Sequence, residues 1–231
     1  MAKRLELTPR LQLIADWVRP GAKLADVGTD HAYLPVWLSI HGRVSHAIAS
    51  DLRKGPLERA RQTGATYGAE QIDYRLGNGL AGIAPEEADT IVIAGMGGET
   101  IASILRAAPW TGEGPHTLLL SPHTKSEELR AFLAENGYAI CREQLVYDRG
   151  TIYPVMEVTA GEMTLTPGQL YGGAKLLRDP LGDRYIIQRI IRLQGAVVGA
   201  RRSDPEKADH LREIITALLE MREEWRHANC G

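Results

Sequence analysis

The chain has few cysteines and no long apolar run, and these absences exclude two classes of protein. Its two cysteines, Cys141 and Cys230, lie far apart and belong to no paired motif, so disulfides are not expected. The first residues lack the apolar core of a signal peptide, and no stretch is apolar for long enough to cross a bilayer. We therefore expect a cytoplasmic protein in which neither cysteine has a functional role.

The chain also lacks a strong excess of charge of either sign. Its formal net charge is -2 at pH 7 and its pI is about 6.4, so any contact with nucleic acid must come from a local patch. Hydrophobic residues make up 44% and charged residues 24%, as in an ordinary folded protein. A length of 231 residues allows one domain and a small appendage.

Short apolar segments alternate with more polar, helix-length segments through the first part of the chain. The apolar segments, typical of buried strands, are residues 24–27, 47–49, 72–76, 90–94 and 117–120. A helix is predicted after Thr8-Pro9, and further helices are predicted at residues 56–67, 99–107 and 126–136. This alternation predicts a mostly parallel sheet of the α/β, Rossmann-like class.

The pattern changes after Gly137. Residues 138–147 and 152–159 follow each other closely, which predicts an antiparallel β-hairpin that ends the sheet. Residues 160–173 are rich in Gly, Thr and Pro and are predicted to be a linker. Two helical patterns follow, separated by Ser203-Asp-Pro205, and they predict a coiled-coil-like helical hairpin. We therefore expect a Rossmann-like domain over residues 1–160 and a linker with a helical hairpin over residues 161–231.

The first predicted strand ends in a motif that is suited to holding a nucleotide. The segment Leu24-Ala-Asp-Val-Gly-Thr-Asp30 runs from an apolar strand into an Asp-x-Gly turn that precedes a helix. Gly28 lets the backbone approach a ligand closely, and Asp26 or Asp30 can accept hydrogen bonds from a cationic amino-acid group. A tight turn with a capping aspartate would use the same residues, so the motif needs its context.

Three further strand ends supply that context. Asp51 ends the second strand, where an acidic residue can bind both ribose hydroxyls, and a solvated helix cap is the alternative. Gly77-Asn-Gly79 follows the third strand, where a polar side chain can contact an adenine edge or a plain glycine turn can form. The fourth strand ends in Ala94-Gly-Met-Gly-Gly98. Because open α/β sheets bind ligands at the carboxyl ends of their strands, four such ends predict a cofactor site.

The acidic character of the first turn argues against a dinucleotide cofactor. Its sequence, Gly28-Thr-Asp-His-Ala-Tyr33, is not the Gly-x-Gly-x-x-Gly that places a pyrophosphate at a helix N-terminus. Asp30 would also face a phosphate with like charge. S-adenosylmethionine is positively charged at sulfur and carries no phosphate, so it suits this turn better.

Taken together, these motifs resemble those of the bacterial tRNA adenine-N1 methyltransferases that act at tRNA position 22. The resemblance rests on residues 25–35, Gly55-Pro56, Gly77-Asn-Gly-Leu80 and Ile93-Ala-Gly-Met-Gly-Gly98, and it extends to Leu7-Thr-Pro-Arg-Leu11 and the terminal hairpin. It implies an S-adenosylmethionine-dependent tRNA (adenine-N1)-methyltransferase. No cluster of His, Cys and carboxylate residues has metal-ligand spacing, so we expect no metal, and we expect no obligate protein partner. The family usually has aspartate at the position of Asn78 and Gln-Pro-Asn in place of Ser121-Pro-His123, which leaves the role of His123 open.

The resemblance also implies functional positions. Cofactor-binding residues would be those of the four strand ends: Asp26, Gly28, Asp30, Asp51, Leu52, Gly77, Asn78, Gly79, Ala94, Gly95 and Met96. The candidates for catalysis are Asp30, His31 and Tyr33. The expected contacts with tRNA are Arg10, Tyr33, Gly97, Pro122, His123, Arg184, Arg189 and Arg192.

Methylation at adenine N1 makes its own demands on a site. N1 has an in-plane lone pair and can attack a methyl group without a general base, so catalysis should depend on positioning and on stabilising the charge that moves onto the base. Asp30 is the leading electrostatic candidate. N1 lies on the Watson–Crick edge, so the base must be unpaired, and Tyr33 or His31 could stack on it. A core tyrosine and a helix-capping histidine are the alternatives.

The two arms of the predicted helical hairpin differ in charge. Residues 173–202 hold seven basic and two acidic side chains, whereas residues 203–231 hold four basic and seven acidic ones. We expect the first arm to attract phosphates, with Lys3, Arg4 and Arg10 extending the basic track, and pairing across the hairpin is the alternative. Two other functions stay open, a small-molecule methyltransferase of the same fold and a non-catalytic RNA-binding protein.

Overall fold

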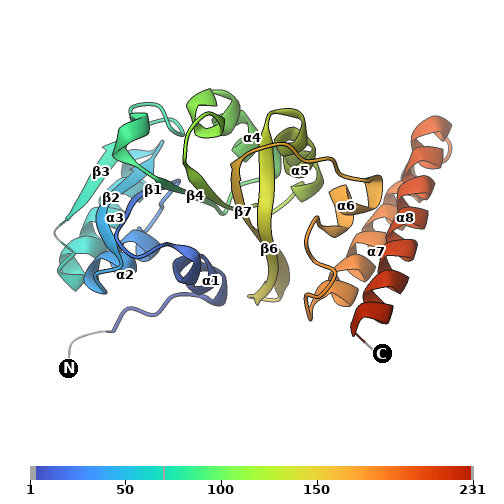
Figure 1. The fold of residues 1–231 in the computed structure, drawn as a ribbon, viewed down its shortest axis with the longest axis horizontal. Helices are drawn as coiled ribbons and strands as arrows, with labels where there is room; N and C mark the ends of the chain where they lie inside the picture. Colours follow the sequence, from blue (N-terminus) through green and yellow to red (C-terminus); the bar gives the residue numbers. More distant parts are fainter. Residues whose placement is uncertain (1–3, 70, 230–231) are drawn as a thin grey trace.

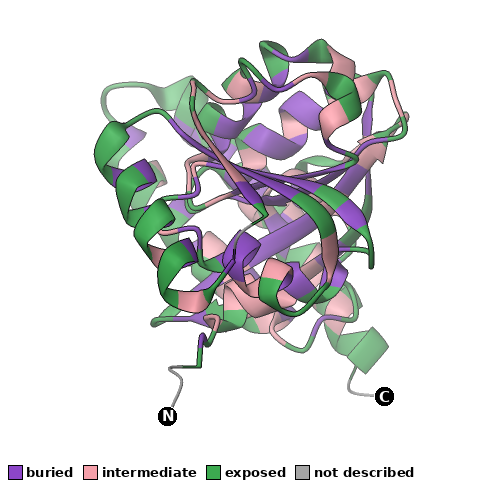
Figure 2. Ribbon diagram, turned by 90° about the vertical axis from the view of Figure 1, so that its left-hand side faces the viewer, coloured by how far each residue is buried: buried purple, intermediate pink, exposed green. Residues whose placement is uncertain are grey.

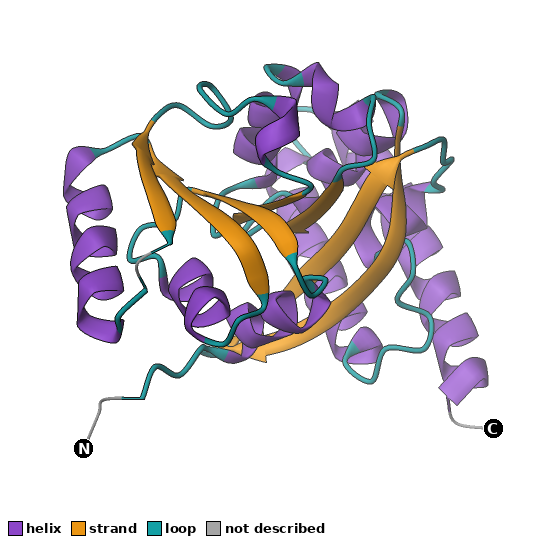
Figure 3. Ribbon diagram, turned by 60° about the vertical axis from the view of Figure 1, so that its left-hand side comes forward, coloured by secondary structure: helices purple, strands orange, loops and turns teal. Residues whose placement is uncertain are grey.

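The computed structural model describes residues 4–69 and 71–229, and two residues named above, Lys3 and Cys230, lie outside this part. Its centre is a seven-stranded sheet with the order β3-β2-β1-β4-β5-β7-β6 (Figures 1 and 3). The strands are β1 (Ala22–Val27), β2 (Val44–Asp51), β3 (Ile72–Leu76), β4 (Thr90–Ala94), β5 (Thr117–Ser121), β6 (Tyr138–Asp148) and β7 (Thr151–Ala160). Strands β1 to β5 are parallel, and β7 pairs antiparallel with both β5 and β6. The expected Rossmann-like sheet is confirmed.

Helices cover both faces of this sheet. They are α1 (Pro9–Trp17), α2 (Tyr33–Ile40), α3 (Lys54–Tyr67), α4 (Gly98–Arg106), α5 (Ser126–Glu135), α6 (Pro167–Gly172), α7 (Gly182–Ala200) and α8 (Pro205–Asn229), with short 3-10 helices η1 (Pro85–Glu87) and η2 (Pro109–Gly112). Side chains of α1, α2 and α3 share one buried apolar cluster, and those of α4 and α5 share the other. The sheet is therefore the middle of three layers.

The apolar strands follow from this double coverage. In β4, Ile91 and Ile93 pack in the cluster of α4 and α5, whereas Val92 between them packs in the cluster of α1 and α2. All three side chains are fully buried, and the middle of the sheet is buried throughout in Figure 2. A strand that is covered on both faces needs apolar residues at successive positions, which is why the sequence shows apolar runs here and not alternation.

Local signals in the sequence place the ends of several elements. The Thr8 side chain accepts a hydrogen bond from the backbone N of Leu11 at 3.4 Å, and Pro9 begins α1, as expected. The turn between β6 and β7 places Arg149 and Gly150 at φ 48° and 86°, the positive values that a tight two-residue hairpin turn requires. The predicted β-hairpin at the edge of the sheet is confirmed.

The segment that was predicted to be a linker is partly helical, so that prediction was wrong for residues 167–172. Thr166 caps α6, and Thr166 and Gln169 exchange hydrogen bonds in a capping box. The helix packs against α5, α7 and α8. Gly and Pro suggested a loop, but the Thr-Pro-Gly-Gln order is also that of a capped helix start.

The predicted helical hairpin is formed by α7 and α8, which lie at one end of the molecule (Figure 1). A fully buried ion pair lies beside its base: the Arg130 guanidinium of α5 is 2.7 Å from the Glu143 carboxylate of β6. Arg130 also donates to the backbone O of Leu170, and Glu143 accepts from the backbone N of Ala174 and Lys175. This network joins the sheet to the segment that leads into α7.

The direction of β6 determines the edge of the sheet at which its last residue lies. Because β7 is antiparallel to both its neighbours, β6 runs in the same direction as β1 to β5. Asp148 at the end of β6 therefore lies toward the same edge as the carboxyl ends of the central strands.

Within residues 4–69 and 71–229, no helix is both long and apolar enough to span a membrane.

We predict that Arg130→Ala lowers the free energy of unfolding by about 3–5 kcal/mol, because it leaves the Glu143 carboxylate buried without its partner. Chemical denaturation measures the change. Arg202→Ala, at an exposed position, is the matched control and should change stability by less than about 0.5 kcal/mol. Replacing both partners, Arg130→Met with Glu143→Leu, should recover only part of the loss, because the backbone O of Leu170 and the backbone N of Ala174 and Lys175 also lose their partners. A loss below about 1 kcal/mol for Arg130→Ala would contradict this account of the network.

Candidate functional site

The turn after β1 has an unusual backbone conformation. Gly28, Asp30 and Ala32 all have positive φ, at 76°, 45° and 54°. The backbone N of Gly28 and of Thr29 both donate to the backbone O of Ser50, at 2.8 and 3.0 Å, which fixes the turn against the end of β2. Positive φ is costly for residues with a side chain, and such strain is typical of sites where the backbone is shaped for a ligand.

A cavity of about 390 Å³, which we call the strand-end cavity, lies over the ends of the central strands. Most of the expected cofactor residues line it: Gly28, Asp30, Asp51, Leu52, Gly77, Asn78, Gly79, Ala94, Gly95 and Met96. These residues come from the turns after β1, β2, β3 and β4. The convergence that the sequence predicted is therefore present in the structure.

Asp51 and Ser50 place polar groups in this cavity. Asp51 is 7% exposed, and its carboxylate accepts a hydrogen bond from the backbone N of Arg53 at 2.9 Å. The hydroxyl of Ser50 is buried and has no hydrogen-bond partner within the part of the chain that the structure describes. A ligand with hydroxyl or amino groups would find partners here.

A second cavity of about 550 Å³, the central cavity, adjoins the first and shares Gly28, Asp30, Ala94 and Gly95 with it. It contains the remaining cofactor candidate, Asp26, and all three catalytic candidates. Its full lining is Thr8, Arg10, Leu11, Asp26, Gly28, Thr29, Asp30, His31, Tyr33, Leu34, Ala94, Gly95, His123, Asp148, Arg149 and Tyr153. A ligand in the strand-end cavity could thus extend into a space large enough for a second molecule.

Asp26 is the buried acid at the floor of the central cavity. Burial raises the pKa of its carboxyl to about 6, although a hydrogen bond from the Thr29 hydroxyl at 2.6 Å opposes that shift, and the nearby charge of Asp51 adds to it. Near neutral pH, the ionised Asp26 carboxylate therefore lowers the stability of the folded protein. A cationic group in the cavity would offset that cost.

Asp30 differs from Asp26 because it is more than half exposed and already paired. Its carboxylate lies 2.8 Å from the Arg59 guanidinium. The next residue, His31, stacks on Tyr33 with ring centroids 5.2 Å apart and an angle of 5° between the rings. Tyr33 is 42% exposed, and the cap position of α2 is Ala32. The alternatives of a core tyrosine and a helix-capping histidine are therefore both wrong, and the two rings form a platform beside Asp30.

The opposite wall of the central cavity combines two residues that were expected to contact tRNA, Arg10 and His123, with Asp148 and Tyr153, which were not predicted. The Arg10 guanidinium lies 4.7 Å from the ring centroid of Tyr153, and His123 is 5.1 Å from the same ring. Burial and the charge of Arg10 lower the pKa of His123, so its imidazole is neutral at pH 7. Asp148 and Tyr153 were missed because their hairpin was interpreted only as the end of the sheet.

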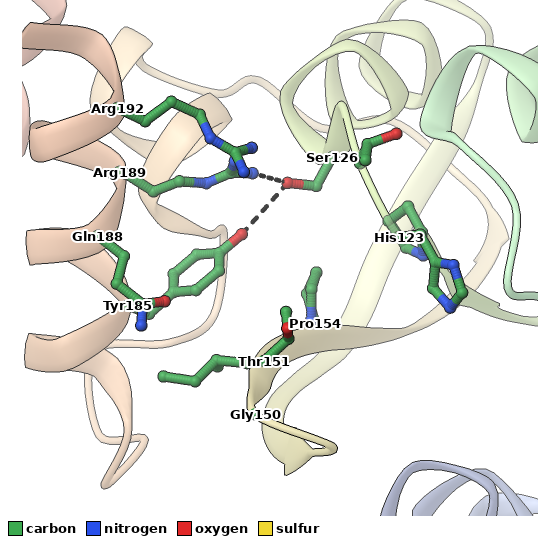
Figure 4. A pocket seen from close by; sticks show the side chains of 12 residues that line it. His123, Ser126, Gly150, Thr151, Pro154, Tyr185, Gln188, Arg189 and Arg192 are labelled. Carbon is green, nitrogen blue, oxygen red and sulfur yellow. Dashed lines mark hydrogen bonds between the residues drawn. The ribbon is translucent and has the colours of Figure 1, made fainter. Parts of the chain in front are cut away.

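A third cavity of about 320 Å³, the hairpin cavity, lies between α7 and the edge of the sheet where the parallel strands end (Figure 4). It includes His123, which also lines the central cavity. In Figure 4, Arg189, Arg192 and Tyr185 extend from α7 toward Ser126 at the start of α5. Arg189 bonds to Ser126 and lies 3.1 Å from the Glu127 carboxylate. The three cavities therefore adjoin one another in a row.

Two of the expected substrate residues lie outside all three cavities. Gly97 is the cap of α4 and forms an isolated bridge with Thr124, which indicates a structural role. Arg184 lies over the ring of Tyr147 at 5.0 Å. The other expected tRNA contacts line the central cavity or the hairpin cavity: Arg10, Tyr33, Pro122, His123, Arg189 and Arg192.

The comparison with protein families agrees with this site. A family model described as a methyltransferase domain matches residues 7–156, which include strands β1 to β6, the first part of β7 and the turns after β1 to β5. The fold and its adjoining cavities therefore define an S-adenosylmethionine-dependent methyltransferase of the Rossmann-like class. Among the described residues, no group of three or more His, Cys, Asp or Glu side chains could hold a metal ion.

Individual relatives specify the family. The chain is 37% identical over 176 residues to the tRNA (adenine(22)-N(1))-methyltransferase of Bacillus subtilis, covering 73% of this chain and 74% of the relative. A putative tRNA (m1A22) methyltransferase of Streptococcus pneumoniae, solved with S-adenosyl-L-methionine, is 32% identical with a TM-score of 0.84, covering 94% of this chain and 100% of that one. The B. subtilis m1A22 tRNA methyltransferase structure has a TM-score of 0.85 at 30% identity, with coverages of 95% and 100%. The chain belongs to this family of bacterial tRNA (adenine(22)-N(1))-methyltransferases.

We predict that Asp26→Asn stabilises the free protein and weakens its affinity for S-adenosylmethionine. The folded protein holds the Asp26 proton with a pKa of about 6, above the value of 3.8 in the unfolded chain, so the wild type loses stability as the pH rises through this range. Between pH 5 and pH 8 the wild type should lose about 1 kcal/mol relative to the variant. Denaturation at several pH values and calorimetric titration of the cofactor measure the two effects. Parallel pH profiles for the two proteins would contradict the assignment.

Proposed function

We propose that this protein transfers a methyl group from S-adenosylmethionine to N1 of the adenine at tRNA position 22. The observation that carries the proposal is the continuity of the strand-end and central cavities, which share Gly28, Asp30, Ala94 and Gly95. Residues 1–160 would form the catalytic domain, and residues 161–231 would form the RNA-binding part.

The residues of the strand-end cavity suit the adenosine half of the cofactor. S-adenosylmethionine supplies a methyl group that is carried on a positively charged sulfur. Asp51 would bind the ribose hydroxyls, with the unpartnered Ser50 hydroxyl beside it. Asn78 is exposed in the turn after β3, where its amide can both donate to and accept from the adenine edge, and it stands where the family usually has aspartate. Leu52 and Met96 would contact the adenosine with apolar surface.

Asp26 and Asp30 suit the other half of the cofactor, near the point where the two cavities join. Asp26 would interact with the cationic amino-acid group, which would favour its ionised form. The pairing of Asp30 with Arg59 reduces its value as a free negative charge, so we place Asp30 in cofactor binding and assign it a smaller electrostatic role than expected. Gly28 would allow the close approach, because its φ of 76° disfavours any residue with a side chain and it places no Cβ between the backbone and the cofactor.

The central cavity would receive the target base. Adenine N1 can attack the methyl group directly, so the residues here need to position the base and do not need to remove a proton. The stacked His31 and Tyr33 rings would hold the face of the base after it leaves its helix. The neutral imidazole of His123 at the opposite wall would add no positive charge near the sulfonium.

The helical hairpin would hold the folded RNA. Across the hairpin, Asp183 of α7 pairs with Arg222 and Arg226 of α8. In the part of the chain that the structure describes, no ion pair joins a basic residue of the first arm to an acidic residue of the second. This favours phosphate binding over the alternative that the opposite charges of the arms neutralise each other. We also propose that the protein modifies tRNA in the cytoplasm. It would need no obligate protein partner there.

The direct test is incubation of the purified protein with labelled S-adenosylmethionine and unmodified tRNA, followed by nucleoside analysis and mapping of the modified position. We predict N1-methyladenosine at position 22 and its loss in Asp51→Ala, whose fold is checked by circular dichroism. Cofactor binding without a tRNA product would favour a small-molecule methyltransferase, and failure to bind the cofactor would favour a non-catalytic RNA-binding protein.

A second test concerns the basic face of α7. We predict that the double variant Arg184→Ala, Arg192→Ala raises the KM for tRNA about 3- to 10-fold with little change in kcat, because phosphate contacts add binding without taking part in the methyl transfer. The slope of log affinity against log salt should fall by about 1–2. Arg212→Ala on α8, an exposed residue paired with Asp209, is the matched control and should leave both quantities unchanged. An equal effect in the control would place the RNA elsewhere.

A further inference from the structure

Asp148, the last residue of β6, is a buried acid that the proposed mechanism does not yet use. It is 6% exposed and lines the central cavity. Within residues 4–69 and 71–229, its carboxylate takes part in none of the side-chain hydrogen bonds or ion pairs of the structure. The carboxylate oxygens are also not among the fully enclosed polar atoms that lack a partner, so they face the open space of the central cavity.

The other buried aspartates show how the protein normally satisfies such a group. Asp26 accepts from the Thr29 hydroxyl, and Asp51 accepts from the backbone N of Arg53. Asp179 accepts from the backbone N of both Leu145 and Leu181. Among the buried aspartates of the described residues, Asp148 alone lacks such a bond. Its carboxylate is therefore available to a ligand in the cavity.

The hairpin turn does not require this carboxylate. Asp148 pairs with Thr151 through the backbone, and the turn residues Arg149 and Gly150 have the positive φ values that close a two-residue turn. In many turns an aspartate side chain bonds to the backbone two residues further on, and that bond is not formed here. A purely local role for Asp148 is not supported.

Among the described residues, no positively charged side chain forms an ion pair with the Asp148 carboxylate. Burial lowers the pKa of Arg10 on the same cavity, and the charges of Tyr153 and Asp148 oppose that shift. Arg10 and Asp148 nevertheless form no ion pair within 4.0 Å, and Nε and Nη1 of Arg10 are buried without a partner. His123, which also lines this wall, has its pKa lowered by burial. The wall therefore presents a carboxylate acceptor that faces the space next to the cofactor residues.

We propose that Asp148 accepts a hydrogen bond from the 6-amino group of the target adenine and stabilises the positive charge that the base acquires. This inference rests on the proposed function. Adenine presents an amino donor at position 6, whereas guanine presents an acceptor oxygen there, which a carboxylate would repel. Asp148 would therefore select adenine as well as assist the transfer, and it would be a catalytic residue because it touches the reacting base.

The charge balance of the step explains the need for a carboxylate. As the bond between N1 and the methyl carbon forms, the bond between that carbon and sulfur breaks, and sulfur keeps the electron pair as a neutral thioether. No proton leaves the base in this step, so the positive charge moves from sulfur to the ring and is shared with the 6-amino group. A carboxylate bonded to that amino group interacts more strongly with the cationic product than with the neutral substrate, which lowers the barrier.

The test compares two enzymes on two substrates. Synthetic tRNA carries either adenine or purine at position 22, since purine keeps N1 but lacks the 6-amino group. Single-turnover rates are measured for the wild type and for Asp148→Asn. On adenine the variant should be about 10- to 100-fold slower, because it lacks the charge of a hydrogen-bonded carboxylate. On purine both enzymes are slow, and their rates should agree within about 2-fold, because the partner of Asp148 is missing.

Several results would overturn the inference. They are an equal loss on both substrates, no loss on adenine, or a loss of affinity for S-adenosylmethionine above about tenfold, which would assign Asp148 to the cofactor. If the wild type does not methylate adenine 22 at all, the proposed function fails together with the inference, whereas a fully active Asp148→Asn overturns the inference alone. The melting temperature of Asp148→Asn should be no lower than that of the wild type, and Asp148→Ala serves as a second variant with the same expected pattern.

Discussion

The site depends on one constraint of the sheet, which is that its parallel strands all end along the same edge. The interiors of the central strands β4 and β5 are apolar and are buried between two layers of helices, so in this part of the sheet polar groups that could bind a ligand lie where the strands end. Asp26 and Asp51 lie at two of these ends, and the glycine-rich turns after β3 and β4 lie at two others. Because β6 runs in the same direction, its last residue Asp148 joins them. The strand-end and central cavities, which adjoin each other, therefore contain the expected cofactor residues together with the wall formed by Arg10, His123, Asp148 and Tyr153.

The buried network around Arg130 fixes the position of the helical hairpin relative to this edge. Arg130 and Glu143 connect α5 and β6 to the segment before α7. Tyr185 and Arg189 of α7 then meet Ser126 at the start of α5, and the hairpin cavity they line reaches His123 at the central cavity. Burial raises the pKa of Tyr185, but the nearby guanidinium groups of Arg189 and Arg130 outweigh it and lower that pKa. Both guanidinium groups are paired with carboxylates, Arg189 with Glu127 and Arg130 with Glu143. An RNA held along α7 would thus be held at a defined distance from the point of transfer.

The sequence predicted those parts of the structure that are set by local signals. Apolar runs identified the strands, and the aspartate or glycine at the ends of the first four runs identified residues that line the strand-end and central cavities. The helix α6 was missed because its Pro and Gly are shared by loops and capped helix starts. Arg10 was assigned to an extended basic track, yet packing against Tyr153 places it in the cavity wall. Asp148 was missed although it also ends a strand, since only the three-dimensional sheet shows that β6 runs with the central strands.

The measurement that tests the account most directly is a structure of this protein bound to S-adenosylhomocysteine and a tRNA substrate. The account predicts that adenine 22 lies unpaired in the central cavity, against the His31 and Tyr33 rings, with N1 toward the cofactor sulfur and its 6-amino group at Asp148. The RNA backbone should follow α7 past Arg192. An adenine that stays stacked in its helix, or a tRNA that contacts α8 and leaves the hairpin cavity empty, would contradict it.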